Sequence, residues 1–259
     1  MRRARILLAA FALAAGADLV SLAVGFGPGH TAAKPLLMLL LASWAAVRGA
    51  PRLLVAALLF GWGGDVLLLS DAQPAFLAGM ASFAAGHVCY LALFRTHGRN
   101  AVPRARAGLL AAGYAIALVG ILVLLWPGLP AGLRVPVAAY SVLLTAMAYF
   151  ALTRLGAVAG AGGALFMFSD TLIATGLADL AQPPLPDLWI MATYPAAQFL
   201  LARGAPATER PAPTTRPAAR PATVGAARGG GLRPLGGGLR SRRPAAAPAD
   251  PGRRPDPSP

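Results

Sequence analysis

The amino-acid sequence predicts an all-α, polytopic membrane protein with eight transmembrane helices and a disordered C-terminal tail. Of the 259 residues, 57% are hydrophobic and only 12% are charged, and the mean hydropathy is +0.62. The apolar residues fall in successive blocks, several of them close to the 20 residues that a helix needs to cross the hydrocarbon layer. An open sheet leaves backbone groups unpaired in lipid, and a transmembrane barrel would show alternating segments of about ten residues. The blocks therefore predict helices.

Eight apolar blocks can be recognised along the chain. They cover residues 6–25, 35–47, 53–69, 76–94, 107–126, 135–152, 161–180 and 187–202. The first block follows the basic segment MRRAR and contains Asp18, and the second begins at Pro35, directly after Lys34. The first block also has the layout of a secretory signal peptide, with a basic start and an apolar core. Its length, its acid and the seven blocks that follow favour a membrane span.

The later blocks supply polar side chains that we expect in the interior of the bundle. The third contains Asp65, and the fourth has Gly79, Phe83, His87 and Tyr90 at helical spacing on one face. The sixth, seventh and eighth blocks add Ser141, Thr145, Tyr149, Asp170, Tyr194 and Gln198. Ordinary hydrogen bonding between helices also explains His87, Gln198 and the stripe of Ser141, Thr145 and Tyr149. Together they predict one polar cluster that four or five helices share.

The distribution of arginine predicts that both termini lie in the cytoplasm. When the chain is threaded through eight spans with its N-terminus inside, 21 of the 23 basic residues fall on the cytoplasmic side. Only Lys34 and Arg134 fall outside, which is the asymmetry of the positive-inside rule. The net charge of +14 is therefore explained by topology, and we expect no nucleic-acid partner. The expected location is a bacterial cytoplasmic membrane.

A change of composition near residue 204 divides the chain into two regions. Residues 1–203 form the predicted eight-helix domain, and residues 204–259 are rich in Pro, Gly, Ala and Arg. A segment with so few large apolar side chains cannot bury enough surface to offset the entropy of ordering. We expect a disordered cytoplasmic tail. Its arginines are compatible with weak attraction to anionic lipid headgroups, and an extension without a function fits equally well.

Asp65 and Asp170 are the strongest candidates for function, because both lie within predicted spans. An aspartate at the centre of a membrane helix costs about 3 kcal/mol on insertion scales, so such residues normally face the bundle interior and take part in function. At 1.5 Å per residue, Asp65 is expected in the outer half of the membrane and Asp170 near its middle.

Lys34 is the only lysine among the 23 basic residues. A compact ammonium at the outer mouth of the second span would hold an anionic headgroup or pair with Asp18 or Asp65. A lysine that extends toward the interface explains it equally well. The predicted spans lack the His and Cys spacing of a zinc site, so we expect neither a metal nor a cofactor.

Five segments follow one another in a recognisable order. They are KPLLMLLL at 34–41, GDVLLL at 64–69, FLAGMASFAAGHVCYLALF at 76–94, GALFMFSDTLIA at 163–174 and YPAAQFLL at 194–201. Together they resemble the lysoplasmalogenase-like (YhhN) membrane family over about residues 5–202. Pro195, directly after Tyr194, departs from the pattern of that family.

The resemblance implies a hydrolase that cleaves the vinyl ether of lysoplasmalogens to a fatty aldehyde and a glycerophospho-alcohol. It assigns the two acids of the family to Asp65 and Asp170. The substrate-binding residues expected from the matched segments are Lys34, His87, Tyr90, Ser169, Tyr194 and Gln198. The expected partners are a lysophospholipid substrate and membrane lipids.

The chemistry of a vinyl ether suits two carboxyl groups. Its hydrolysis begins with proton transfer to the β-carbon, so one acid must be protonated while its neighbour is ionised. Asp170, as the deeper group, is the expected proton donor. Asp65 is then expected to stabilise the oxocarbenium ion or to orient water.

Other classes of function remain open from the sequence. A proton-coupled transporter of a small molecule or lipid also needs acids within the membrane, and Asp65 and Asp170 lie four spans apart, as in a parallel duplication. An intramembrane aspartyl protease would have Gly-x-Gly-Asp, which residues 62–65 miss by one position. A structural lipid-binding protein would not explain two acids.

Overall fold

The computed structural model describes residues 2–99 and 101–206, and within these ranges the chain is all-α. The helices are α1 (Arg2–Ala23), α2 (Gly27–Val47), α3 (Arg52–Leu67), α4 (Gln73–His97), α5 (Arg104–Leu125), α6 (Ala131–Phe150), α7 (Ala157–Leu177) and α8 (Pro186–Gly204). One turn of π-helix, η1 (Ala151–Leu155), extends α6. Each predicted block overlaps one helix, so the all-α class is confirmed. The structure describes no residue beyond 206, so nearly all of the predicted tail lies outside the described residues.

Six of the helices in the described ranges are long and apolar enough to cross a membrane: α1, α2, α4, α5, α6 with η1, and α7. The chain is therefore an integral membrane protein. The two helices outside this set are α3, which has 16 residues, and α8, which has 19 residues and includes Asp187, Gln198 and Arg203. Helix α3 falls outside the set because of its length, and both helices carry part of the polar cluster.

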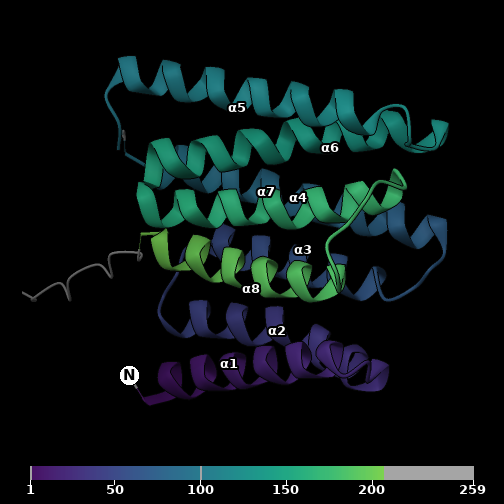
Figure 1. The fold of residues 1–259 in the computed structure, drawn as a ribbon. Coiled ribbons are helices and arrows are strands. Elements are labelled where there is room, and N and C mark those ends of the chain that lie inside the picture. Colours follow the sequence, from purple (N-terminus) through teal and green to yellow (C-terminus); the bar gives the residue numbers. More distant parts are fainter. Residues whose placement is uncertain (1, 100, 207–259) are drawn as a thin grey trace, which may run out of the picture. The chain divides into compact units, whose positions relative to one another are not determined.

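The helices lie side by side and alternate in direction (Figure 1). The closest packing joins α3 with α4, α7 with α8, and α1 with α2. Helices α1 and α5 lie at opposite edges of the bundle, with α3, α4, α7 and α8 between them (Figure 1). Much of the side-chain surface of α1 and α5 is exposed and apolar, as expected for helices that face lipid. The polar cluster is thus built on the inner helices.

Glycines in α7 allow this helix to approach its neighbours at backbone distance. A Cβ atom at Gly162 would lie 2.8 Å from the carbonyl oxygen of Ala197 in α8. One at Gly163 would lie 2.7 Å from Cα of Ala148 in α6. Small residues at such positions are typical of membrane helix interfaces. They fix α7 between α6 and α8, and Asp170 follows two turns later on the same helix.

All eight helices begin earlier than the predicted blocks, by one to eight residues, and the difference is largest for α2. Helix α2 begins at Gly27 and keeps Pro35 inside it, which membrane helices tolerate. Helix α7 begins at Ala157, because its Ala/Gly-rich start packs against other helices. Asp65 and Asp170 are therefore each thirteen residues, or about 20 Å, from the first residue of their helices. Asp170 lies three residues past the middle of α7, whereas Asp65 lies two residues before the end of α3, so the expected order of depth stays a prediction.

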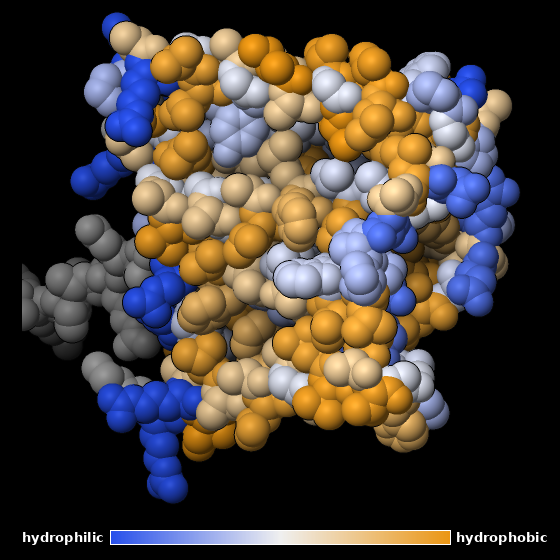
Figure 2. Space-filling view, viewed as in Figure 1, coloured by the Kyte–Doolittle hydropathy of each residue, from blue (hydrophilic) through white to orange (hydrophobic). Residues whose placement is uncertain are grey.

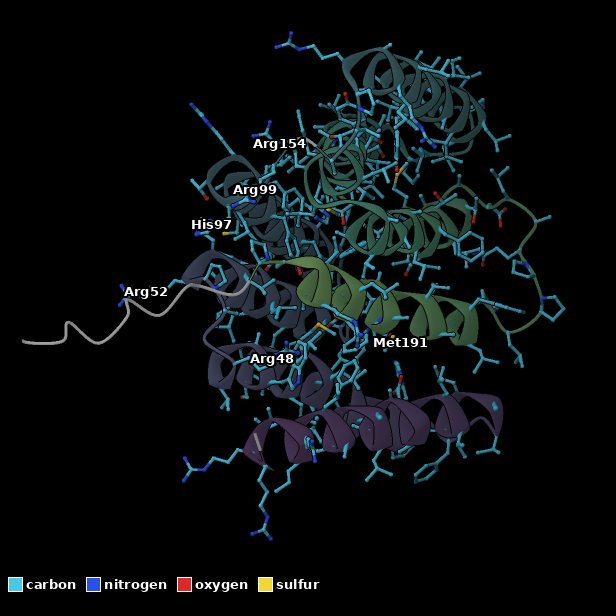
Figure 3. All side chains as sticks on the ribbon, turned by 90° about the vertical axis from the view of Figure 1, so that its left-hand side faces the viewer. Arg48, Arg52, His97, Arg99, Arg154 and Met191 are labelled. Carbon is cyan, nitrogen blue, oxygen red and sulfur yellow. The ribbon has the colours of Figure 1, made fainter. Side chains whose placement is uncertain are left out.

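Basic side chains gather at one end of the bundle. Figure 3 views this end and labels Arg48, Arg52, Arg99 and Arg154 together with His97. The same end is strongly hydrophilic in Figure 2, whereas apolar surface covers much of the length of the helices. A concentration of arginine at one end of the bundle is the asymmetry that the positive-inside rule describes.

Candidate functional site

Asp65 and Asp170 line the same cavity, although 105 positions separate them in the sequence. The cavity has a volume of about 920 Å³, including its open mouth, and is bordered by residues of α2 to α8. Its polar lining consists of Lys34, Asp65, Tyr140, Ser141, Thr145, Ser169, Asp170, Thr171 and Tyr194. The other lining residues are apolar, among them Leu68, Phe76, Met80, Leu125 and Leu177. Such a mixture suits an amphiphilic ligand.

The Asp65 carboxylate is at the end of a chain of hydrogen-bond donors. The hydroxyl of Tyr194 donates to Oδ2 of Asp65 at 3.0 Å, and Nε2 of Gln198 donates to the Tyr194 oxygen at 3.4 Å. The hydroxyl of Tyr90 donates to Oε1 of Gln198 at 2.6 Å. Gly61, one turn before Asp65, makes room for the amide, since a Cβ there would lie 2.9 Å from Nε2 of Gln198. Asp65 itself is only 2% exposed.

A second, shorter chain ends on Asp170. The hydroxyl of Tyr140 in α6 donates to Oδ2 of Asp170. Nε2 of His87 in α4 lies 3.1 Å from the Tyr140 oxygen, and the imidazole packs edge-on against Phe166 with ring centres 4.8 Å apart. Nδ1 of His87 is buried and has no hydrogen-bond partner among the described residues. Each acid is thus held by one tyrosine, and each tyrosine is backed by a further polar side chain.

Lys34 enters the cavity from α2, and its charge acts on two carboxylates. These are Asp65 in α3 and Asp18 in α1. Asp18 is 1% exposed, and its Oδ1 lies 2.8 Å from Nδ1 of His30, one helical turn before Lys34. The structure thus buries Asp18 between α1 and α2. Lys34 therefore lies close enough to two acids for its charge to stabilise their ionised forms.

The structure separates the predicted site residues into two groups. Lys34, Asp65, Ser169, Asp170 and Tyr194 line the cavity. The remaining three predicted substrate-binding residues, His87, Tyr90 and Gln198, are buried behind the lining and take part in the hydrogen-bond chains.

Sequence reasoning missed two residues of the site, Tyr140 and His30. Tyr140 precedes Ser141, the first member of the polar stripe predicted in the sixth span, and its hydroxyl contacts Asp170. Only part of the predicted stripe lines the cavity. Ser141 and Thr145 do so, whereas the hydroxyl of Tyr149 donates to the carbonyl oxygen of Ala107 at 3.2 Å. For His30, the available signal was its position four residues before Lys34, which places both on one face of a helix.

No group of three or more His, Cys, Asp or Glu side chains able to hold a metal ion occurs in the described part of the chain. What the cavity offers is a pair of carboxyl groups, one lysine and several hydroxyls in a largely apolar space. The charges of the two acids act on each other. Such a pair can hold one transferable proton and one negative charge at once.

Comparison with known proteins identifies the family. The YhhN family model matches residues 29–205. The lysoplasmalogenase of Mycobacterium bovis is 36% identical over 160 residues, which cover 59% of this chain and 60% of that protein. Lysoplasmalogenase TMEM86B of Sus scrofa is 38% identical over 149 residues, covering 57% of this chain and 61% of that protein. The human protein of that name is 35% identical over 164 residues, which cover 59% of this chain and 63% of that protein.

No solved structure matches the chain. The chain spans about 60% of the length of the Mycobacterium and Sus scrofa relatives it matches. The family match extends from the first turn of α2 to the end of α8 and includes both acids and Lys34. This chain therefore belongs to the YhhN family.

Proposed function

We propose that the chain hydrolyses the vinyl ether bond of lysoplasmalogens, releasing a fatty aldehyde and a glycerophospho-alcohol. The observation that carries this proposal is the cavity that Asp65 and Asp170 share with Lys34. Relatives that match across this region are named lysoplasmalogenase, which supplies the substrate class. The apolar lining would accommodate the alkenyl chain, and Lys34 would bind the phosphate.

In the proposed reaction, the two acids have different roles. Protonated Asp170 transfers its proton to the β-carbon of the vinyl ether, and the C=C electrons form the new C–H bond, leaving an oxocarbenium ion. Asp65, ionised beside Lys34 and its chain of donors, stabilises this cation and orients water. The water oxygen bonds to the cationic carbon, and the proton it loses restores the single proton of the acid pair. The hemiacetal then divides into aldehyde and alcohol.

The test is aldehyde release by the purified full chain in detergent, without any ion gradient. We expect aldehyde from a 1-alkenyl lysophospholipid and none from the matched 1-alkyl lysophospholipid, which has no double bond to protonate. A proton-coupled transporter, the alternative function, would release no aldehyde from either. It would instead move protons across vesicles when its substrate is added. That pair of results would contradict the proposed hydrolase.

We further propose that all eight helices cross the membrane, with both termini in the cytoplasm of a bacterial cell. The gathering of arginines at one end of the bundle supports this topology (Figure 3). Helix α3 is about 24 Å long, so the bilayer must thin slightly or its flanking residues must enter it. Reporter domains fused after Arg99 and after Gly204 should lie in the cytoplasm, and one fused after Asp71 should lie outside. If any one of the three reporters lies on the opposite side of the membrane, the proposed topology is wrong.

A further inference from the structure

His87 occupies a position that is costly for an imidazole. The side chain is 1% exposed, and Nδ1 has no partner in the part of the chain that the structure describes. An apolar side chain of similar size would leave no unpaired polar atom there. Among the described residues, the imidazole makes a single hydrogen bond, between Nε2 and the Tyr140 hydroxyl, so this contact is what His87 provides.

Two proton arrangements are compatible with the three side chains. In the first, Nε2–H of His87 donates to Tyr140, Tyr140 donates to Oδ2 of Asp170, and the unpaired Nδ1 is an acceptor. In the second, every bond is reversed and the unpaired Nδ1 carries a proton. Buried donors without a partner are rarer in proteins than buried acceptors without one. The first arrangement is therefore favoured.

The first arrangement determines which oxygen of Asp170 carries its proton. Oδ2 accepts the hydrogen bond from Tyr140, and Oδ1 has no hydrogen-bond partner among the described residues. Asp170 lines the cavity, where a substrate would reach it. We propose that His87 and Tyr140 are positioning residues that direct the transferable proton of Asp170 to Oδ1, facing the cavity. The catalytic meaning of this inference rests on the proposed function.

A kinetic test uses three substitutions in the full chain. His87→Leu should lower kcat for the alkenyl lysophospholipid by about ten- to a hundredfold, because the acid proton is no longer directed, and it should leave KM nearly unchanged. His87→Gln should recover most of the loss, since its amide N–H can reach Tyr140. Tyr140→Phe should match His87→Leu or exceed it, and the double variant should be no worse than Tyr140→Phe alone.

Thermal unfolding distinguishes positioning from a structural role. His87→Leu should unfold at the temperature of the wild type or above it, because the substitution removes an unpaired buried atom. A structural hydrogen bond between α4 and α6 would instead make the variant unfold earlier. The matched control is His97→Leu, at the exposed end of α4, which should change neither kcat nor the unfolding temperature. A His87→Leu protein that fails to fold, or that keeps full kcat, overturns the inference.

Infrared spectroscopy tests the same inference without any substrate. The C=O stretch of protonated Asp170 can be identified as the band that disappears in Asp170→Asn. We expect this band to shift in His87→Leu and in Tyr140→Phe and to stay in place in His97→Leu. If the wild type releases no aldehyde but the band shifts, the proposed hydrolase is wrong and the positioning role stands. An unshifted band in His87→Leu overturns the positioning role even if aldehyde is released.

Discussion

Replacement of either cavity acid by asparagine should nearly abolish aldehyde release while the protein still folds. We expect Asp65→Asn and Asp170→Asn each to lower kcat by about a thousandfold or more, since general acid–base catalysis alone contributes about 10²- to 10⁴-fold. Asn cannot donate the proton that we assign to Asp170 or carry the charge that we assign to Asp65. Its side-chain oxygen can still accept the hydrogen bond from Tyr194 or Tyr140.

The measurement is single-turnover aldehyde release by the purified variants, together with their unfolding temperatures. Asp187→Asn is the matched control, because Asp187 is exposed in the first turn of α8 and does not line the cavity. It should keep full activity. Full activity in Asp65→Asn or Asp170→Asn would remove that residue from the catalytic pair. Loss of folding in either variant would mean that the acid also has a structural role.

The helices and the two acids could be predicted because the bilayer makes strong demands on sequence. An apolar block of membrane length strongly indicates a transmembrane helix. An ionisable side chain within such a helix is rare, because its insertion into lipid costs free energy. Asp65, Asp170 and Lys34 stood out for this reason, and the structure brings all three to one cavity. No comparable demand identifies Tyr140, since a tyrosine is an ordinary residue in a membrane helix.

The exact start of each helix could not be predicted from hydropathy alone. The Ala/Gly-rich segment before Phe166 has few large side chains and was placed partly outside the seventh span. In the structure its small residues pack against α8 and α6, which adds a turn to the start of α7. Packing of this kind is set by neighbouring helices rather than by local hydropathy. The pairing of Asp18 with His30 is likewise a contact between two helices.

Lys34→Ala should raise KM for an alkenyl lysophospholipid by about 10- to 100-fold, the loss expected for one hydrogen bond to a charged group. A phosphate contact is made similarly in the ground state and in the transition state, so kcat should fall less than KM rises. The measurement compares this substrate with a 1-alkenylglycerol, which has the same vinyl ether and no phosphate. For the alkenylglycerol, Lys34→Ala should leave KM nearly unchanged.

The comparison separates two effects of the same lysine, because its charge acts on Asp65 as well as on any bound phosphate. Loss of support for Asp65 would lower kcat for both substrates equally, whereas loss of the phosphate contact would raise KM only for the lysophospholipid. Lys34→Arg should recover part of the affinity, since the charge is kept while the compact ammonium is lost. If Lys34→Ala leaves KM for the lysophospholipid unchanged, the headgroup binds elsewhere and the proposed orientation of the substrate in the cavity is wrong.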